Sequence, residues 1–219
     1  MNRYRTILFD LDGTLVDSGE GIMNCAELAL RHFDIPLPTP SQMRTFVGPP
    51  LRDSFARFGV KPENLDEAMA IFRRRYASTG KFEGFLYPGI ASLLKTLHDT
   101  GFHLLVATSK PEVMAVEILT HFGVASYFEY IAGATLDNSR TTKEQVIAYL
   151  LEKVGGFDHA VMVGDTTFDV LGAAVHHIPT IGVSWGYGLE EDTVQAGAIA
   201  MAHDAADLLA LLQGEKGQG

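Results

Sequence analysis

TILFDLDGT, residues 6–14, changes character abruptly at its centre. The run Thr6–Phe9 is short, continuous and predominantly apolar, and Asp10, Asp12 and Gly13 follow it directly. A short apolar run that stops at turn-forming residues is typical of a strand buried on both faces, as in parallel sheets. We therefore expect a central buried strand that delivers an acidic loop at its carboxyl end.

The rest of the chain supplies partners for this strand. Similar apolar runs recur, and stretches with apolar residues at helical spacing lie between several of them. Strands that alternate with helices indicate a parallel sheet with right-handed crossovers. We expect an α/β, Rossmann-like core with helices on both faces. The expected strands are 104–107, 160–163, 180–183 and, more weakly, 199–201, and the expected helices are 90–97, 113–122 and 146–154.

One long stretch breaks the alternation. Residues 17–85 contain no convincing buried strand and show amphipathic helical patterns instead, at 22–33, 43–58 and 65–76. We interpret this stretch as a helical cap domain inserted after the first strand. The predicted core domain then comprises residues 1–16 and 86–219.

Composition narrows the class of protein. The 219 residues are 47% hydrophobic and 20% charged, which is ordinary for a globular protein. No apolar stretch reaches the length of a membrane span, and no secretory signal is recognisable. The net charge of −10 argues against a nucleic-acid partner. A single cysteine, Cys25, excludes an intramolecular disulfide and suits a reducing compartment, so we expect a cytoplasmic protein without membrane partners.

Polar residues follow three of the expected strands. Ligands of open α/β sheets bind beyond the carboxyl ends of the strands, where neighbouring strand ends meet. Four carboxylates and two hydroxyls follow the strands 6–9, 104–107 and 160–163: Asp10, Asp12, Asp165, Asp169, Thr108 and Ser109. One lysine, Lys143, lies at the start of the helix that precedes strand 160–163. We expect them to share one crevice.

A cluster of four carboxylates requires positive charge. Two carboxylates about 4 Å apart repel by roughly 4 kcal/mol at an effective dielectric constant near 20. Oxygen ligands without cysteine or histidine suit a hard cation, and Mg²⁺ is the usual one where phosphate supplies further ligands. With Lys143, such a metal would let an acidic protein accept an anionic phosphate.

These residues resemble the motifs of a known family. The stretch from Phe9 to Ser18, Phe-Asp-Leu-Asp-Gly-Thr-Leu-Val-Asp-Ser, resembles the first motif of the haloacid dehalogenase-like (HAD) hydrolase superfamily. Thr108, Lys143 and Gly164-Asp165 with Asp169 follow in the order of the remaining motifs. The resemblance spans nearly the whole chain, and the helical insert resembles the cap of the phosphoglycolate phosphatase-like subgroup.

The resemblance implies catalytic roles. Asp10 would attack phosphorus and form an aspartyl-phosphate, which splits one difficult displacement into two easier steps. Asp12 would protonate the leaving oxygen and later deprotonate the attacking water. Thr108, the Ser109 backbone N–H and Lys143 would bind the phosphate.

The resemblance also implies a metal site. Asp10, Asp165 and the backbone carbonyl of Asp12 would hold Mg²⁺, and Asp169 would orient these ligands or Lys143 from behind. Arg52, in the cap, is a candidate for contact with the rest of the substrate.

Each of these residues also has an ordinary structural explanation. An aspartate after a strand is often a turn former or a helix N-cap. Thr108 and Lys143 would suit the first residues of helices, and Asp17 or Ser18 could equally cap the first helix of the insert. A cap explains one aspartate, however, and not two that flank a leucine before Gly-Thr.

Several functions share these motifs. The expected function is Mg²⁺-dependent hydrolysis of a small phosphorylated metabolite, with phosphoglycolate narrowly ahead of a nucleoside 5′-monophosphate. A 5′-nucleotidase and a sugar-phosphate mutase of the same superfamily remain alternatives. A dehalogenase would not need Asp12, and a non-enzymatic phosphoacceptor domain would lack the insert. The sequence leaves the oligomeric state open, as well as transfer of phosphate to a second substrate.

Overall fold

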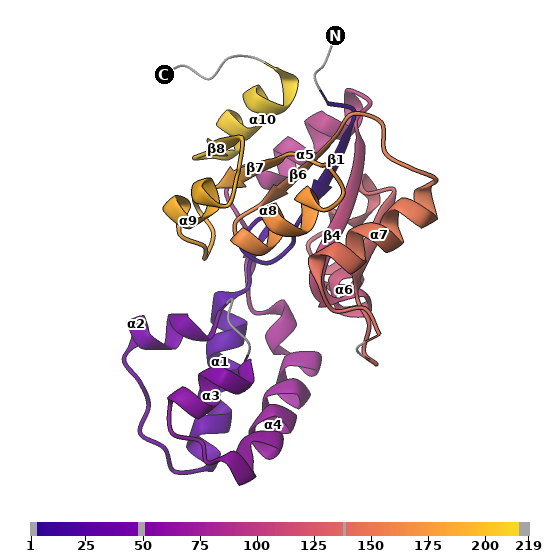
Figure 1. Cartoon of the computed structure of the whole chain (residues 1–219). Coiled ribbons are helices and arrows are strands. Elements are labelled where there is room, and N and C mark those ends of the chain that lie inside the picture. The colour runs from indigo at the N-terminus through magenta and orange to yellow at the C-terminus, as the bar shows by residue number, and fades with distance from the viewer. Residues whose placement is uncertain (1–3, 48–50, 138, 215–219) are drawn as a thin grey trace. The chain divides into compact units, whose positions relative to one another are not determined.

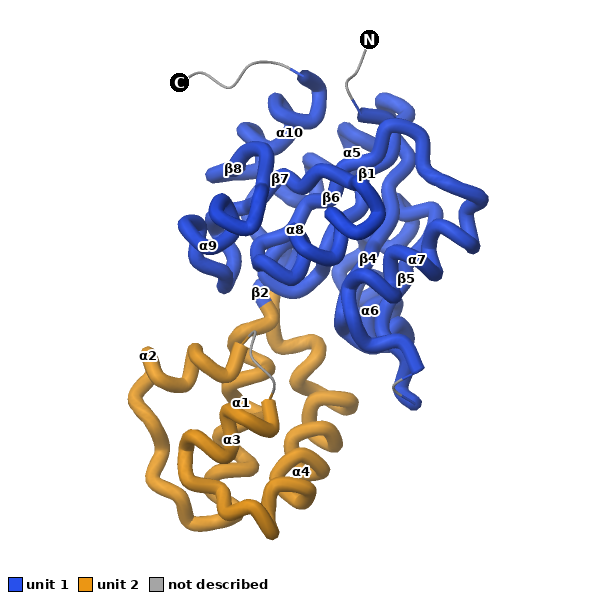
Figure 2. The backbone as a smooth tube through the Cα atoms, viewed as in Figure 1, with its two compact units in different colours: residues 1–17, 86–219 blue, residues 18–85 orange. Residues whose placement is uncertain are grey.

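The computed structural model describes residues 4–47, 51–137 and 139–214. The chain forms two compact units, which Figure 2 shows in different colours. Unit 1 comprises residues 1–17 and 86–219, and unit 2 comprises residues 18–85. We expected the insert to begin at Asp17, and unit 2 begins one residue later, at Ser18. That unit 2 acts as a cap stays a prediction.

Unit 1 is built on a six-stranded sheet whose paired strands are all parallel (Figure 1). The strand order is β5-β4-β1-β6-β7-β8. The expected α/β, Rossmann-like fold is confirmed. The strands are β1 (Thr6–Phe9), β4 (His103–Pro111), β5 (Tyr130–Ala134), β6 (Ala160–Gly164), β7 (Thr180–Val183) and β8 (Ala200–Ala202).

β1 lies inside this sheet, between β4 and β6, and it is buried on both faces. Ile7 and Phe9 pack on one side with residues of α5 (Ile90–Asp99), α6 (Glu112–His121) and α10 (Ala205–Gln213). Leu8 packs on the other side with residues of α7 (Lys143–Val154) and α8 (Thr167–Ala174). The period of two along a strand explains this division. Because neighbours surround β1, the residue that follows it has a well-defined position.

Unit 2 consists of helices up to the strand β3 (Phe85–Leu86), which pairs with β2 (Val16–Asp17). The α-helices are α1 (Gly19–His32), α2 (Pro40–Met43), α3 (Leu51–Arg57) and α4 (Leu65–Ser78). Three short 3₁₀ helices accompany them: η1 (Arg44–Phe46), η2 (Pro62–Asn64) and η3 (Gly80–Phe82).

The helical pattern expected over residues 43–58 is interrupted. η1 ends at Phe46, the next residue, Val47, is extended with a φ of −88° and a ψ of 126°, and α3 begins at Leu51. Extended backbone cannot continue a helical hydrogen-bond ladder. Gly48, Pro49 and Pro50 lie outside the described residues. Within the described part of the chain, no helix has both the length and the apolar character needed to cross a membrane.

Candidate active site

The loop after β1 is wound tightly against β6. The backbone N–H of Asp10 donates to the carbonyl of Val163 at 2.9 Å, and the N–H groups of Leu15 and Val16 both donate to the carbonyl of Leu11. Gly13 has a φ of +83°, and a Cβ placed there would lie 2.2 Å from Oδ2 of Asp165. Glycine is required at this position both by its backbone conformation and by the closeness of Asp165.

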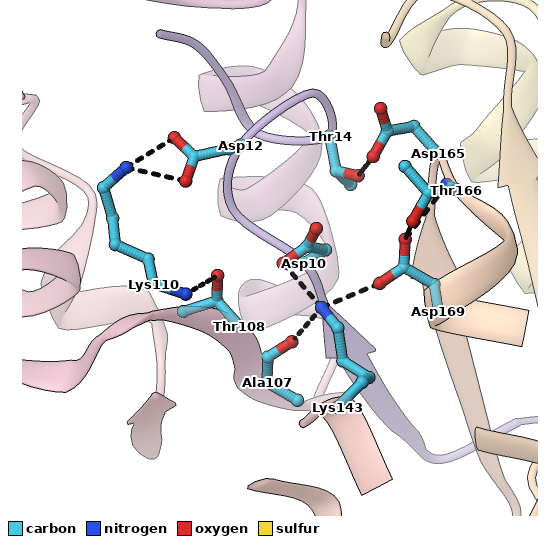
Figure 3. Close-up of polar contacts among 10 residues, drawn as sticks. All are labelled: Asp10, Asp12, Thr14, Ala107, Thr108, Lys110, Lys143, Asp165, Thr166 and Asp169. Atoms are coloured by element: carbon cyan, nitrogen blue, oxygen red, sulfur yellow. Dashed lines mark hydrogen bonds and ion pairs between the residues drawn. The ribbon is translucent and has the colours of Figure 1, made fainter. Parts of the chain in front are cut away.

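Lys143 joins two of the carboxylates. It is the first residue of α7, which begins there because Thr142 and Gln145 form a capping box. Its Nζ lies 2.7 Å from Oδ1 of Asp10, Oδ1 of Asp169 and the carbonyl oxygen of Ala107 (Figure 3). An ammonium group has three protons to donate. Lys143, whose side chain is 4% exposed, therefore meets three acceptors, and two of them are carboxylates.

Burial and crowding set the protonation of this cluster. Burial raises the pKa of Asp10 to about 6, although the Lys143 ammonium works against that rise. Burial, followed by the charges of Asp169 and Asp10, raises the pKa of Asp165 to about 7. Burial disfavours the charge of Lys143, but Asp10 and Asp169 outweigh it and raise the pKa of Lys143. The carboxylates are short of positive charge, and a bound cation would relieve this.

Three carboxylates lie close together where such a cation would bind. Oxygens of Asp10, Asp165 and Asp169 all lie within 4.8 Å of one another, and all three residues are buried. Carboxylate oxygens of this kind are ligands for hard divalent ions. Oδ2 of Asp169 accepts hydrogen bonds from the N–H and hydroxyl of Thr166, and Oδ1 contacts Lys143. Because both oxygens of Asp169 already have these partners, Asp10 and Asp165 are the carboxylates of this cluster that fit a divalent metal.

The side chain of Asp12 points away from this cluster, toward Lys110 (Figure 3). Nζ of Lys110 donates to both carboxylate oxygens of Asp12, at 2.9 and 2.7 Å. The side chain of Lys110 is only 7% exposed. Lys110 was not expected in the site. The signal was available, because a lysine directly follows the Thr-Ser pair that ends an apolar run.

Of the expected phosphate-binding residues, Thr108 and Ser109 lie in the last part of β4, whereas Lys143 begins α7. Thr108 is buried, and its Oγ1 accepts a hydrogen bond from the backbone N–H of Lys110 at 3.2 Å. A hydroxyl that accepts this bond still has its own proton to donate. Ser109 is exposed. Arg52 belongs to unit 2 and forms an exposed ion pair with Asp66 of the same unit. The roles assigned to these residues stay predictions.

Thr14 was not foreseen as part of the site. Its hydroxyl lies 3.5 Å from Oδ1 of Asp165, and its carbonyl accepts a hydrogen bond from Nε1 of Trp185. Thr14 occupies the end of the motif, four residues after Asp10, so its position in the sequence was a usable signal.

Known proteins resemble the chain over most of its length. Residues 7–183 match the haloacid dehalogenase-like hydrolase family. A 5′-nucleotidase of Pseudomonas aeruginosa is 41% identical over 213 residues, which cover 96% of this chain and 95% of that protein. The tyrosine-protein kinase PtkA of Mycobacterium tuberculosis is 40% identical over 200 residues, which cover 91% of this chain and 68% of PtkA. A phosphoglycolate phosphatase of Vibrio cholerae is 29% identical over 219 residues, which cover 95% of this chain and 97% of that protein.

The fold is shared as well. The crystal structure of a predicted phosphatase from Clostridium acetobutylicum superimposes with a TM-score of 0.86 at 42% identity. The match covers 95% of this chain and 97% of that one. The matched region 7–183 includes all of β1 except Thr6, and every carboxylate of the cluster. The chain belongs to the haloacid dehalogenase-like hydrolase family.

Proposed function

We propose that this hydrolase is a Mg²⁺-dependent phosphatase that acts on small phosphomonoesters through an aspartyl-phosphate at Asp10. The observation that carries the proposal is the position of Asp10. It follows the buried strand β1, and its Oδ1 is held by the ammonium of Lys143 at 2.7 Å. A carboxylate held in this way can be aimed at phosphorus at little entropic cost when substrate binds.

The proposed reaction has two balanced steps. In the first, an oxygen of Asp10 bonds to phosphorus, the ester P–O bond breaks, and the leaving oxygen takes a proton from Asp12. In the second, water bonds to phosphorus and gives a proton to Asp12, and the bond between phosphorus and Asp10 breaks. Splitting the displacement lowers each barrier, and a positioned acid–base group contributes typically 10²- to 10⁴-fold.

Lys110 places a condition on this scheme. Both carboxylate oxygens of Asp12 are engaged by Nζ of Lys110. Asp12 therefore has to turn away from Lys110 and take up a proton before it can protonate a leaving oxygen near Asp10.

The proposed metal completes the balance of charge. Asp10, Asp12, Asp165 and Asp169 would carry four negative charges when ionised, and Lys110 and Lys143 carry two positive charges. A divalent ion held by Asp10, Asp165 and the carbonyl of Asp12 would bring the sum to zero. When bound, Mg²⁺ would supply electrostatic stabilisation to the anionic phosphoryl group. Mg²⁺ is the usual metal where phosphate oxygens supply part of the coordination.

The substrate is proposed from similarity. The higher identity to a 5′-nucleotidase, 41% against 29% for a phosphoglycolate phosphatase, favours nucleoside 5′-monophosphates over phosphoglycolate. This reverses the narrow preference drawn from the motifs. A panel of both esters, ranked by kcat/KM, tests the choice, and comparably poor rates on both would exclude both.

Phosphotransfer is the second candidate, because a relative named as a tyrosine kinase is 40% identical. The acceptor in the second step would then be a tyrosine hydroxyl in place of water. Phosphate released into solution and phosphate transferred to a tyrosine peptide can be measured in the same reaction.

The first experiment is turnover of p-nitrophenyl phosphate with Mg²⁺ and after chelation. We expect metal-dependent release of p-nitrophenol by the wild-type protein and none by Asp10→Asn. Absence of release with Mg²⁺ and other divalent ions would overturn the phosphatase proposal.

A further inference from the structure

Residues 184–188, Ser-Trp-Gly-Tyr-Gly, connect β7 with α9 (Glu190–Gln195), and we call them the 184–188 loop. This loop binds the carboxylate of Asp165 through its backbone. The N–H groups of Tyr187 and Gly188 donate to Oδ2 of Asp165 at 2.8 and 3.3 Å. A Cβ at Gly186 would lie 2.3 Å from Cβ of Asp165, so the loop backbone packs directly on this side chain.

The same loop also contacts the two segments through which the chain leaves unit 1 and returns to it. The hydroxyl of Tyr187 donates to Oδ1 of Asp17, the last residue of unit 1 before unit 2, at 2.6 Å. Tyr87, the second residue after the return, shares a hydrogen bond with Tyr187. The ring of Tyr87 lies 6.3 Å from that of Trp185, centre to centre. We call residues 16–17 and 86–87 the connecting segments.

Tyr187 therefore forms hydrogen bonds through both its backbone N–H and its side-chain hydroxyl. Its N–H contacts Asp165, and its hydroxyl contacts Asp17. Aromatic side chains have few rotatable bonds, so these two contacts are joined by a stiff element. A shift of the connecting segments would move the donor that orients Asp165. We propose that Tyr187 is a positioning residue that couples the conformational order of the connecting segments to metal binding at Asp165.

This inference rests on the proposed function, because it needs a metal at Asp165. It goes beyond that function in assigning a role to a residue outside the acidic cluster. Coupling between two sites is reciprocal: if the segments affect metal affinity, metal must affect the segments by the same factor. Residues that orient a metal ligand usually contribute measurably to affinity. A tyrosine that merely stabilises the fold would change neither the affinity for the metal nor the effect of the metal on the connecting segments.

The test compares Tyr187→Phe with the wild-type protein. This change keeps the ring and the backbone N–H and removes only the hydroxyl. We expect the dissociation constant for Mg²⁺, measured by titration calorimetry without substrate, to rise about fivefold or more, the lower end of typical coupling between sites. Asp17→Ala should also raise it, and the double variant should be no weaker than Tyr187→Phe alone, since loss of the Tyr187 hydroxyl already removes the contact with Asp17. Asp17→Asn keeps an acceptor and should retain most of the affinity.

Tyr130→Phe is the matched control. Tyr130 lies on β5, also in unit 1, and its hydroxyl is 2.9 Å from that of Tyr149 on α7. Its replacement removes a tyrosine hydroxyl hydrogen bond without touching the 184–188 loop. Magnesium affinity should stay at the wild-type value in this control.

Hydrogen exchange supplies the reciprocal readout. In the wild-type protein, Mg²⁺ should slow amide exchange in the connecting segments, and in Tyr187→Phe this effect should be lost. Wild-type affinity and wild-type protection in Tyr187→Phe would overturn the coupling while leaving the phosphatase proposal intact. Failure of the wild-type protein to bind Mg²⁺ would remove the metal site itself and with it this inference.

Discussion

Replacement of Lys143 by methionine removes a buried ammonium group and keeps an unbranched side chain that is one atom shorter. Two carboxylate oxygens and one carbonyl oxygen, from Asp10, Asp169 and Ala107, lose a donor at 2.7 Å. Breaking a buried ion pair by removing one partner typically costs about 3–5 kcal/mol, because the remaining charge is left without compensation. We expect a loss of stability in this range for metal-free protein at pH 8.

The loss should depend on pH. Lys143 is the largest cause that lowers the pKa of Asp10, so without it that pKa rises further above its value of about 6. A carboxyl group whose pKa is higher in the folded than in the unfolded state stabilises the fold below the unfolded pKa. That contribution is lost as the pH rises through the folded pKa. The unfolded pKa is about 3.9. The destabilisation by Lys143→Met should therefore be larger at pH 8 than at pH 5.

Urea unfolding of metal-free protein at both pH values measures this difference, with a probe in unit 1 such as the fluorescence of Trp185. Lys95→Met is the control, because Lys95 forms an exposed ion pair with Asp99 on α5 of the same unit. Its unfolding midpoint should stay close to wild type at either pH. A Lys143→Met variant with wild-type stability at pH 8, or with a loss that does not change with pH, would refute the charge balance described here.

Three further predictions concern the site. Asp12→Asn should lower the rates of both phosphorylation and dephosphorylation of Asp10, by about 10²- to 10⁴-fold in kcat; single-turnover kinetics measure each step, and a wild-type rate for either would exclude Asp12 from it. The rise in melting temperature caused by Mg²⁺ should be larger at pH 8 than at pH 5, because Asp10 and Asp165, with pKa values of about 6 and 7, must release protons before they bind metal. An equal rise at both pH values would contradict the assignment of these two residues as metal ligands. Gly13→Ala should abolish that rise, because the new Cβ would lie 2.2 Å from Oδ2 of Asp165, whereas Gly101→Ala, with the same φ of +83° and no atom within 4 Å, should retain it.

The sequence was sufficient for the central part of the fold. Continuous apolar runs at Thr6–Phe9 and 160–163 predicted β1 and β6, since strands buried on both faces have an unmistakable composition. β5 was missed because it is an edge strand of the sequence Tyr-Ile-Ala-Gly-Ala, with two half-covered residues and a glycine. Its conformation depends on pairing with β4, which no local pattern reveals.

The site likewise contains residues that the sequence predicted and contacts that it did not. The aspartates and Lys143 could be placed from the sequence, because each occupies the end of a recognisable strand or the start of a helix. The ion pair between Lys110 and Asp12 spans 98 positions and could not be inferred from local spacing. The contacts of Tyr187 with Asp165 and Asp17 span 22 and 170 positions. Such pairs are created by the order of strands in the sheet.

In the proposed reaction, Asp10 carries the phosphoryl group during turnover. The most direct measurement is mass spectrometry of Asp12→Asn protein, mixed with p-nitrophenyl phosphate and Mg²⁺ and quenched rapidly in acid. Because p-nitrophenolate leaves with little need for a proton, this variant should slow the breakdown of the intermediate more than its formation from this substrate. We expect a peptide containing Asp10 that is heavier by one phosphoryl group, and no such peptide from protein that also carries Asp10→Asn. Turnover with phosphate found on another residue, or with none bound to the protein at any time point, would contradict it.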